Sequence, residues 1–249
     1  MTIRKPIITG AALATAVVLA GCSSANSSSG GSTPGTPGAK GEVSSAPAIS
    51  GTQLTGTQLT AALLTSSDLP VAGFLAPIGT DVGSGGSLTT AKAKFNPSTM
   101  SCADLQNALG EAGFGETAMS TSALVSRSRE TVSQTVYQFA DAAAANAFYT
   151  AVKANSDSCR TFTSDGQGSD FKLTVTITAA KAGVGQQDFA NTQTGTENGT
   201  PAALASTMAL DGPDVLLVGA AKLGTASVPT DIDSGSLLAM LISKIAAAG

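Results

Sequence analysis

The feature that most limits how this chain can fold is a run of small and polar residues near its start. Residues 23–48 read SSANSSSGGSTPGTPGAKGEVSSAPA, in which Ser, Gly, Pro and Thr dominate and no apolar periodicity occurs. Such a run cannot bury enough apolar surface to offset the entropy lost on ordering, so we predict a disordered tether at residues 22–50. A single globular domain is expected at residues 51–249.

Residues 1–21 have the layout of a secretory signal peptide. Arg4 and Lys5 precede an apolar stretch, residues 7–20, that is too short for a comfortable membrane span. It ends in Leu19-Ala20-Gly21-Cys22, which is similar to the bacterial lipobox. We expect cleavage before Cys22 and acylation of its thiol, with chains such as palmitate holding the protein at the extracytoplasmic face of the cell membrane. The alternative is a plain signal peptide that happens to contain a cysteine.

The charge balance and the absence of histidine exclude several classes of site and partner. Removing the leader with Arg4 and Lys5 takes the formal net charge from −4 to −6. So acidic a chain has no electrostatic footprint for nucleic acid, and DNA and RNA are excluded as partners. With no His in the chain, His-dependent catalytic triads and His metal sites are excluded as well. No cofactor and no metal are expected.

Apolar periodicity and capping residues predict interleaved helices and strands after the tether. Helices are expected at 57–64, 101–112, 141–155 and 233–245, capped by Ser101, by Asp141 and by Asp233 or Ser234. Strands are expected at 115–126, 131–139, 171–180, 184–194, 203–210 and 215–221, with a Gly/Ser loop at 81–86. Short turns between consecutive strands favour an antiparallel sheet. The predicted fold class is α+β, a single-domain sandwich in which three to four helices pack on that sheet.

Cys102 and Cys159 remain as an even pair once Cys22 is assigned to lipid. In an exported protein such a pair is expected to form a disulfide. Their separation of 57 residues corresponds to a stabilisation of roughly 4 kcal/mol if the bond is unstrained. A reactive thiol or a metal site is the alternative, and it lacks suitable partner residues in the sequence.

Several short features follow one another in a characteristic order. They are Leu63-Leu64, Leu69-Pro70, Gly73-Phe74, Cys102 with Leu105, the strand 132–139, an Ala-rich helix with Phe148, and Cys159 before Phe162. In this order they resemble the extracellular sensor domain of mycobacterial protein kinase H, a domain type that also occurs in many actinobacterial lipoproteins. The resemblance covers about residues 60–247. It implies a single α+β domain with an antiparallel sheet and a cleft for a small ligand.

The sequence departs from that family at two points. The kinase sensor has two disulfides where this chain can form one, and Asp157-Ser158 stands where the family frequently has a Trp before the cysteine that follows the second helix. No kinase is present in the chain.

No catalytic residue is predicted. Ser243 and Lys244 are adjacent in a helix, so their side chains point apart and a solvated helix end is expected. Asp211 and Asp214 flank a Gly-Pro turn, and the calcium-loop spacing that could unite such carboxylates is missing.

The other polar and aromatic candidates are also expected to be structural. Asp231 and Asp233 are expected to precede and cap the last helix. Arg127, Arg129 and Glu130 are expected at a solvated hairpin tip. The aromatic residues Tyr137, Phe139, Phe148 and Tyr149 are expected in the core rather than in a sugar platform.

The first functional hypothesis is a non-enzymatic ligand-binding or sensing lipoprotein of the cell envelope. The alternative is a carrier of apolar lipid or glycolipid, which requires a hydrophobic cavity of several hundred Å³. A hydrolase is the third, and the sequence offers no constellation for it. The expected partners are the membrane, through Cys22, and a small-molecule, lipid or protein ligand whose contact residues the sequence does not identify.

Overall fold

The computed structural model describes residues 53–75, 78–83, 94–126, 128–164, 171–176, 183–197 and 199–249. The expected signal peptide, Cys22 and nearly all of the Ser/Gly/Pro-rich segment lie outside these residues. In the described part of the chain, no helix is long and apolar enough to cross a membrane.

The protein is built on one antiparallel sheet with the strand order β1-β2-β3-β8-β7-β6-β5-β4. The strands are β1 (Ile78–Gly83), β2 (Ala118–Val125), β3 (Glu130–Gln138), β4 (Thr161–Ser164), β5 (Phe171–Thr176), β6 (Gln187–Glu197), β7 (Thr200–Asp211) and β8 (Asp214–Leu223). After β3 the chain leaves the sheet and re-enters at the opposite edge as β4. Four successive antiparallel pairings then lead back until β8 pairs with β3.

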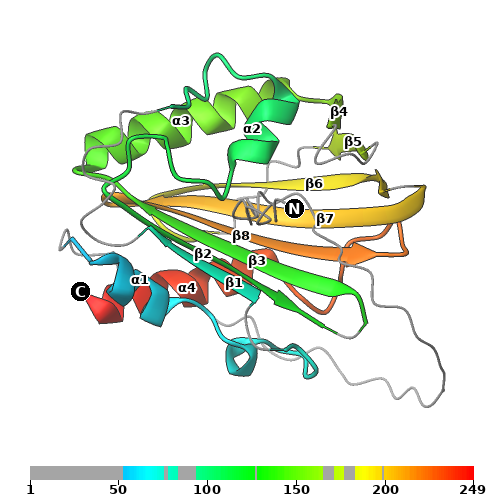
Figure 1. The fold of residues 1–249 in the computed structure, drawn as a ribbon, viewed down its shortest axis with the longest axis horizontal. Helices are drawn as coiled ribbons and strands as arrows, with labels where there is room; N and C mark the ends of the chain where they lie inside the picture. Colours follow the sequence, from blue (N-terminus) through cyan, green and yellow to red (C-terminus); the bar gives the residue numbers. More distant parts are fainter. Residues whose placement is uncertain are drawn as a thin grey trace, which may run out of the picture.

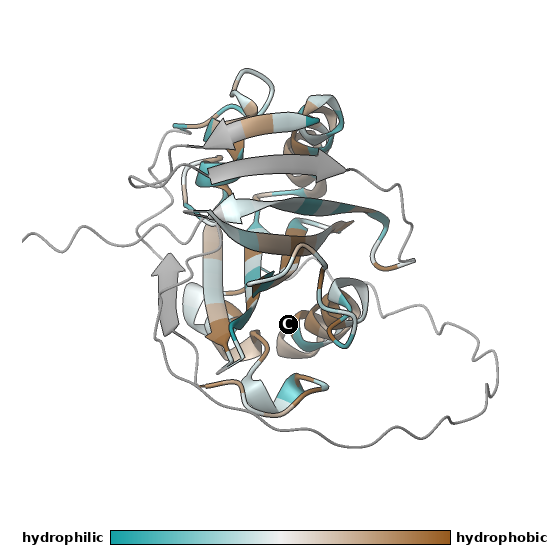
Figure 2. Ribbon diagram, turned by 90° about the vertical axis from the view of Figure 1, so that its right-hand side faces the viewer, coloured by the Kyte–Doolittle hydropathy of each residue, from teal (hydrophilic) through white to brown (hydrophobic). Residues whose placement is uncertain are grey.

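Helices cover both faces of this sheet (Figures 1 and 2). One face carries α1 (Gly56–Ala62), the short 3₁₀ helix η1 (Ser66–Asp68) and α4 (Ser234–Ala248), and the other carries α2 (Cys102–Ala108) and α3 (Ala142–Ser158). We call these the α1/α4 face and the α2/α3 face. The predicted α+β sandwich with an antiparallel sheet and four α-helices is confirmed.

Each face has its own hydrophobic core. On the α1/α4 face, α4 buries five aliphatic side chains over alternate residues of β3 and β8, and these five are Leu237, Leu238, Leu241, Ile242 and Ile245. Burial of a side chain of this size contributes roughly 2 kcal/mol before entropy is counted. On the α2/α3 face the core is aromatic, and it includes the four residues expected there, Tyr137, Phe139, Phe148 and Tyr149.

Capping residues begin the helices where the sequence predicts. The side chains of Ser101, Asp141 and Asp233 accept hydrogen bonds from the backbone N–H groups three residues further on, at 3.1, 2.8 and 2.9 Å. The helix expected at 101–112 nevertheless ends at Ala108. Gly110 follows with φ 101° and donates its N–H to the Tyr137 hydroxyl at 2.5 Å, so a tertiary contact ends this helix early.

Two expectations about strands require correction. The loop expected at 81–86 is wrong at its start, because Asp81–Gly83 belong to β1 and pair with Thr121–Met119 of β2. β4 was not predicted, since its four residues are too few for an alternating pattern. Of the strand expected at 171–180, residues 171–176 form β5, and residues 177–180 lie outside the described ones.

A buried glutamine fastens the segment after α1 to the sheet. Gln134 of β3 is fully buried. Its Oε1 accepts the Leu64 N–H at 2.7 Å, and its Nε2 donates to the Leu64 carbonyl at 2.8 Å and to Ser122 Oγ at 2.9 Å. Because all its polar atoms are partnered, this side chain satisfies the backbone of a connection that would otherwise be buried without hydrogen bonds.

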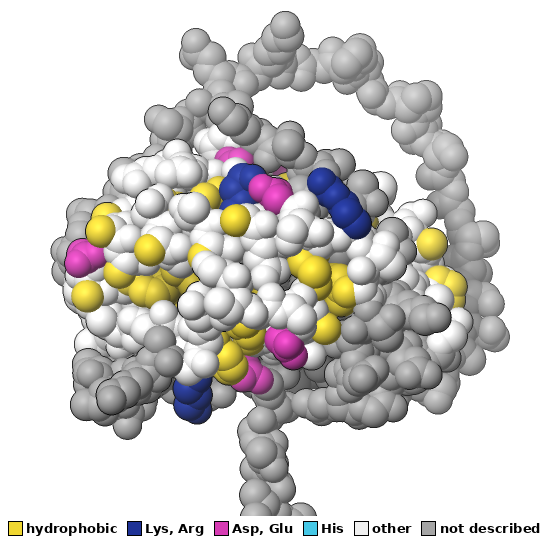
Figure 3. All heavy atoms as spheres, turned by 90° about the horizontal axis from the view of Figure 1, so that it is seen from above, with side chains coloured by type: hydrophobic (Ala, Val, Ile, Leu, Met, Phe, Trp, Pro, Cys, Tyr) yellow, Lys and Arg dark blue, Asp and Glu magenta, His cyan; other side chains and the backbone are white. Residues whose placement is uncertain are grey.

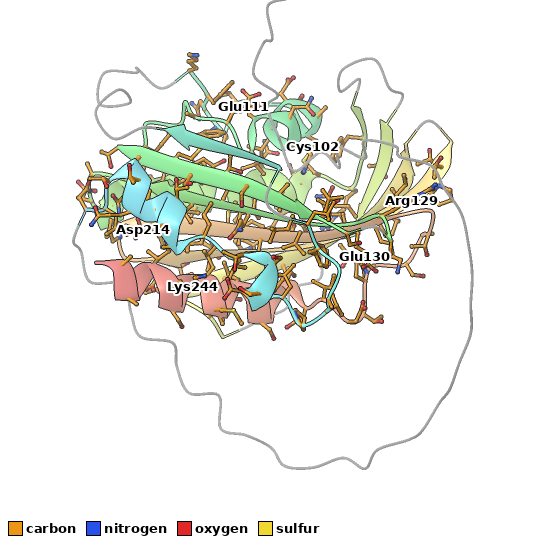
Figure 4. The ribbon with its side chains drawn as sticks, turned by 60° about the horizontal axis from the view of Figure 1, so that its bottom comes forward. Cys102, Glu111, Arg129, Glu130, Asp214 and Lys244 are labelled. Atoms are coloured by element: carbon orange, nitrogen blue, oxygen red, sulfur yellow. A yellow bond between two sulfur atoms is a disulfide. The ribbon has the colours of Figure 1, made fainter. Side chains whose placement is uncertain are left out.

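Polar groups mark both ends of the β3/β8 pairing. At one end Lys222 donates to Glu130, with Nζ and Oε1 at 2.7 Å, and at the other end Gln138 stands opposite Asp214. Figure 4 shows Glu130 and Asp214 at opposite ends of the strands. Burial alone would raise the pKa of Glu130, but hydrogen bonds from Lys222 and Ser128 outweigh it and hold the pKa below its usual range.

Candidate functional site

A pocket lies on the α2/α3 face, between the two helices and strands β4, β6, β7 and β8. Its lining includes the apolar side chains of Leu105 and Val152 from the helices and of Phe189, Met208 and Leu217 from the sheet. The space open to the centres of water molecules is about 30 Å³, which is room for about two waters. The pocket therefore admits a small group rather than an acyl chain.

A disulfide and a pair of hydrogen bonds hold the helices beside this pocket in place. The disulfide between Cys102 and Cys159 joins the first residue of α2 to the residue after α3, with 5.8 Å between the Cα atoms, and the predicted pairing is confirmed. The Asn155 amide donates to the carbonyls of Pro97 and Met100 at 2.9 and 2.8 Å. The start of α2 is thus fixed to the end of α3 covalently, and the loop before α2 is fixed to α3 by hydrogen bonds.

Amide and hydroxyl side chains form the polar part of the lining. Gln193 Nε2 donates to Gln106 Oε1 at 3.2 Å and to Asn191 Oδ1 at 3.3 Å. Ser206 Oγ donates to the same Asn191 oxygen at 2.7 Å. These contacts bring α2, β6 and β7 together through residues up to 87 positions apart in the sequence.

Gln193 is 3% exposed, and its Oε1 atom has no hydrogen-bond partner in the described part of the protein. Both Nε2 hydrogens are directed to oxygen atoms, so the position of Oε1 follows from the network. A buried carbonyl oxygen without a donor costs roughly 1–3 kcal/mol. The pocket therefore contains an acceptor that a bound donor would satisfy.

Sequence reasoning did not identify these amide residues. Asn191 and Gln193 alternate with Thr192 and Thr194, so β6 is polar on both faces here and no contrast marks the inward residues. The order of the strands in the sheet places Asn191 and Gln193 next to α2, and no local pattern in the sequence indicates that order.

The polar residues considered in the sequence as catalytic or calcium-binding candidates have structural roles and are not in the lining of the pocket, whereas the disulfide cysteines Cys102 and Cys159 are. Lys244 Nζ pairs with Asp68 at 2.7 Å, and Ser243 Oγ donates to the Ala239 carbonyl at 3.0 Å. Asp233 caps α4 as expected, and Asp231 is an exposed residue before it. In the described residues, no group of three or more Cys, Asp or Glu side chains is placed to hold a metal ion.

The expected hairpin tip between β2 and β3 is partly confirmed. Arg129 is exposed there with φ 65°, whereas Arg127 lies outside the described residues. Glu130 was expected to be solvated and is instead 6% exposed. The reason is its pairing with Lys222 of β8, which the sequence pattern could not anticipate.

Asp214 is the most perturbed carboxylate of the described chain. It is 0% exposed, and neither its carboxylate oxygens nor the amide atoms of Gln138 beside it make a hydrogen bond of regular geometry. Burial raises the pKa of Asp214 to about 7, the Gln138 amide opposes the rise, and the negative charge of Asp211 adds to it. The side chain lies on the α1/α4 face, which separates it from the pocket.

The chain is similar in sequence and fold to one group of extracellular domains. Residues 54–234 match the family described as the PknH-like extracellular domain. The crystal structure of the extracellular domain of PknH from Mycobacterium tuberculosis superimposes with a TM-score of 0.58 at 18% identity, covering 79% of this chain and 98% of that one. At this identity the structural match shows the fold alone. A search among curated proteins finds no relative of the chain.

Proposed function

The chain belongs to the family of PknH-like extracellular domains, and from this premise we propose that it is a membrane-tethered, non-enzymatic module that senses a small ligand outside the cytoplasm. The observation that carries the proposal is the pocket on the α2/α3 face. The disulfide and the Asn155 hydrogen bonds hold its helices in place, and Gln193 Oε1 in its lining has no hydrogen-bond partner among the described residues. A rigid, concave site with a few convergent polar groups is the usual form of a small-molecule site.

Two features support binding without catalysis. None of the described side chains that line the pocket is charged, so this part of the lining offers no general acid or base. Ser206 donates its proton to an amide oxygen rather than to a base, which leaves its hydroxyl without the activation that a nucleophile needs.

The size of the pocket weighs against the carrier of apolar lipid or glycolipid. Pockets that enclose drug-sized or larger ligands measure about 300–1,000 Å³, whereas the volume of this pocket is about 30 Å³. We therefore propose the sensing module and not the carrier.

The test of ligand binding uses the mature chain with Cys22→Ser and the low-molecular-mass fraction of its host's cell envelope. Proton–nitrogen correlation spectra should show shifts of the Gln193 and Asn191 side-chain amides when this fraction is added. Ser156→Trp, which places an indole in the lining of the pocket, should abolish the shifts, whereas Thr150→Trp at an exposed position of the same helix should leave them unchanged. If these amides do not respond, or respond equally in both variants, the pocket is not the sensing site.

The membrane tether rests on the lipobox-like Leu19-Ala20-Gly21-Cys22. Growth of the host with an alkyne-labelled fatty acid should label the wild-type protein and not a Cys22→Ala variant, which should also lose its membrane fractionation. Retention of the label in that variant would place the lipid elsewhere.

A further inference from the structure

We propose that the pocket selects a neutral, sugar-type ligand by receiving one hydroxyl-bearing group, whose O–H donates to Gln193 Oε1. This inference rests on the proposed ligand-binding function and names the class of ligand. It follows from three observations: the charge of the lining, the balance of donors and acceptors in it, and its size.

Among the residues that the structure describes, the lining contains no charged side chain that could compensate a charged ligand. Its polar members are Gln106, Asn155, Ser156, Asn191, Gln193 and Ser206, all of them neutral. The nearby ions Lys153 and Asp157 pair with each other at 2.6 Å on the solvated side of α3. Burying an unpaired charge is much more costly than burying a hydroxyl, so the pocket disfavours carboxylates, phosphates and ammonium groups. Seen from this side, the described surface is largely uncharged (Figure 3).

The hydrogen-bond balance of the lining requires a donor from the ligand. Asn191 Oδ1 already accepts from Ser206 and Gln193, and both Gln193 Nε2 hydrogens are in use. Asn155 is occupied with two backbone carbonyls. Among the described residues of the lining, the buried polar atom without a partner is Gln193 Oε1, an acceptor. A ligand that only accepts hydrogen bonds would leave this atom unsatisfied.

The size of the pocket and the apolar part of its lining favour a sugar. Room for about two waters fits a hydroxymethyl group, which has two heavy atoms, while the ring remains at the mouth. Phe162, a partly exposed aromatic member of the lining, can contact the C–H groups of such a ring. A free sugar and the sugar terminus of an envelope glycan share this chemistry.

The experiment compares matched sugars on the mature Cys22→Ser chain, with the Gln193 and Asn191 amide shifts as the readout. Three methyl hexosides, of glucose, galactose and mannose, are titrated beside their 6-deoxy and 6-carboxylate analogues. At least one neutral hexoside should bind. Its 6-deoxy analogue, which lacks the donating hydroxyl, and its 6-carboxylate analogue, which is charged, should each bind at least about tenfold more weakly.

Two further comparisons complete the experiment. One tests the role of Gln193 with variants, and the other asks whether the ligand is a free sugar or the terminus of an envelope glycan. Gln193→Met removes the acceptor at similar volume and should weaken the neutral hexoside at least about tenfold, whereas Thr150→Trp should not. If Gln193→Met does not fold, the 6-deoxy comparison on the unchanged pocket still decides the matter. An oligosaccharide bearing the same terminal hexose should bind more tightly than the monosaccharide if an envelope glycan is the source, and equally if the free sugar is.

The outcomes separate this inference from the proposed function. If a carboxylate analogue binds as well as the neutral hexoside, or if no hexoside shifts these amides while the envelope fraction does, the ligand class is wrong and the sensing site stands. If neither hexosides nor the envelope fraction shift them, both proposals fail.

Discussion

Replacing the carboxylate of Asp214 with an amide should make the protein more stable above neutral pH. Asp214 is 0% exposed, and burial raises its pKa from 3.8 to about 7. The folded state therefore holds this proton more tightly than the unfolded chain. The resulting stabilisation is complete below about pH 4 and is lost as the pH rises to about 7.

The size of the effect follows from the two pKa values. The difference between 3.8 and about 7 corresponds to about 4 kcal/mol of unfolding free energy. Asp214→Asn removes the ionisation and should recover most of this loss at about pH 8, while changing little at about pH 4. For a domain of this length the gain corresponds to a rise in Tm on the order of 10 °C.

The assay is urea unfolding of the disulfide-intact protein at several pH values between about 4 and 8. The matched control is Asp231→Asn, at an exposed position before α4, which should leave the pH dependence of wild type unchanged. If Asp214→Asn and wild type lose stability in parallel between about pH 4 and 8, Asp214 does not ionise in a buried setting and the reasoning is refuted.

Three further substitutions test the disulfide, the Gln134 hydrogen bonds and the Glu130–Lys222 ion pair. Replacing both cysteines of the disulfide with alanine should lower the unfolding free energy by roughly 2–4 kcal/mol, measured by urea unfolding, and an unchanged value would mean that the bond adds nothing to stability. Gln134→Leu leaves the Leu64 N–H and carbonyl buried without partners and should cost roughly 2–4 kcal/mol, and a loss well below 1 kcal/mol would show that water takes its place. Lys222→Met leaves Glu130 buried without its cation, so thermal unfolding should occur at lower temperature at about pH 7. Much of the loss should be recovered in acid, as the Glu130 carboxylate, no longer held ionised by Lys222, takes up a proton. A deficit that does not depend on pH would instead indicate lost packing.

Local signals in the sequence predicted much of the fold. The alternation of 131–139 and the caps Ser101, Asp141 and Asp233 depend on residues close together in the chain, and all four occur as expected. The cysteine pair followed from counting residues. The order of the strands did not follow, because β8 pairs with β3 through contacts that no local pattern encodes.

The pocket was beyond sequence reasoning for the same reason. Gln193 and Gln106 meet across 87 residues, and each is an ordinary polar residue in its own segment. Asp214 was noted only as part of an acidic turn, whereas its complete burial depends on the cover that the α1/α4 face provides.

The position of the β3/β8 pairing has a consequence for how the protein folds. The paired residues are separated by 92 positions at Glu130 and Lys222, whereas the hairpins on either side close over a few residues each. Short loops close faster than long ones, and non-local strand pairing slows folding. We therefore expect the β2–β3 hairpin and the β4–β8 strands to form separately and to pair along β3 and β8 in the last, rate-limiting step.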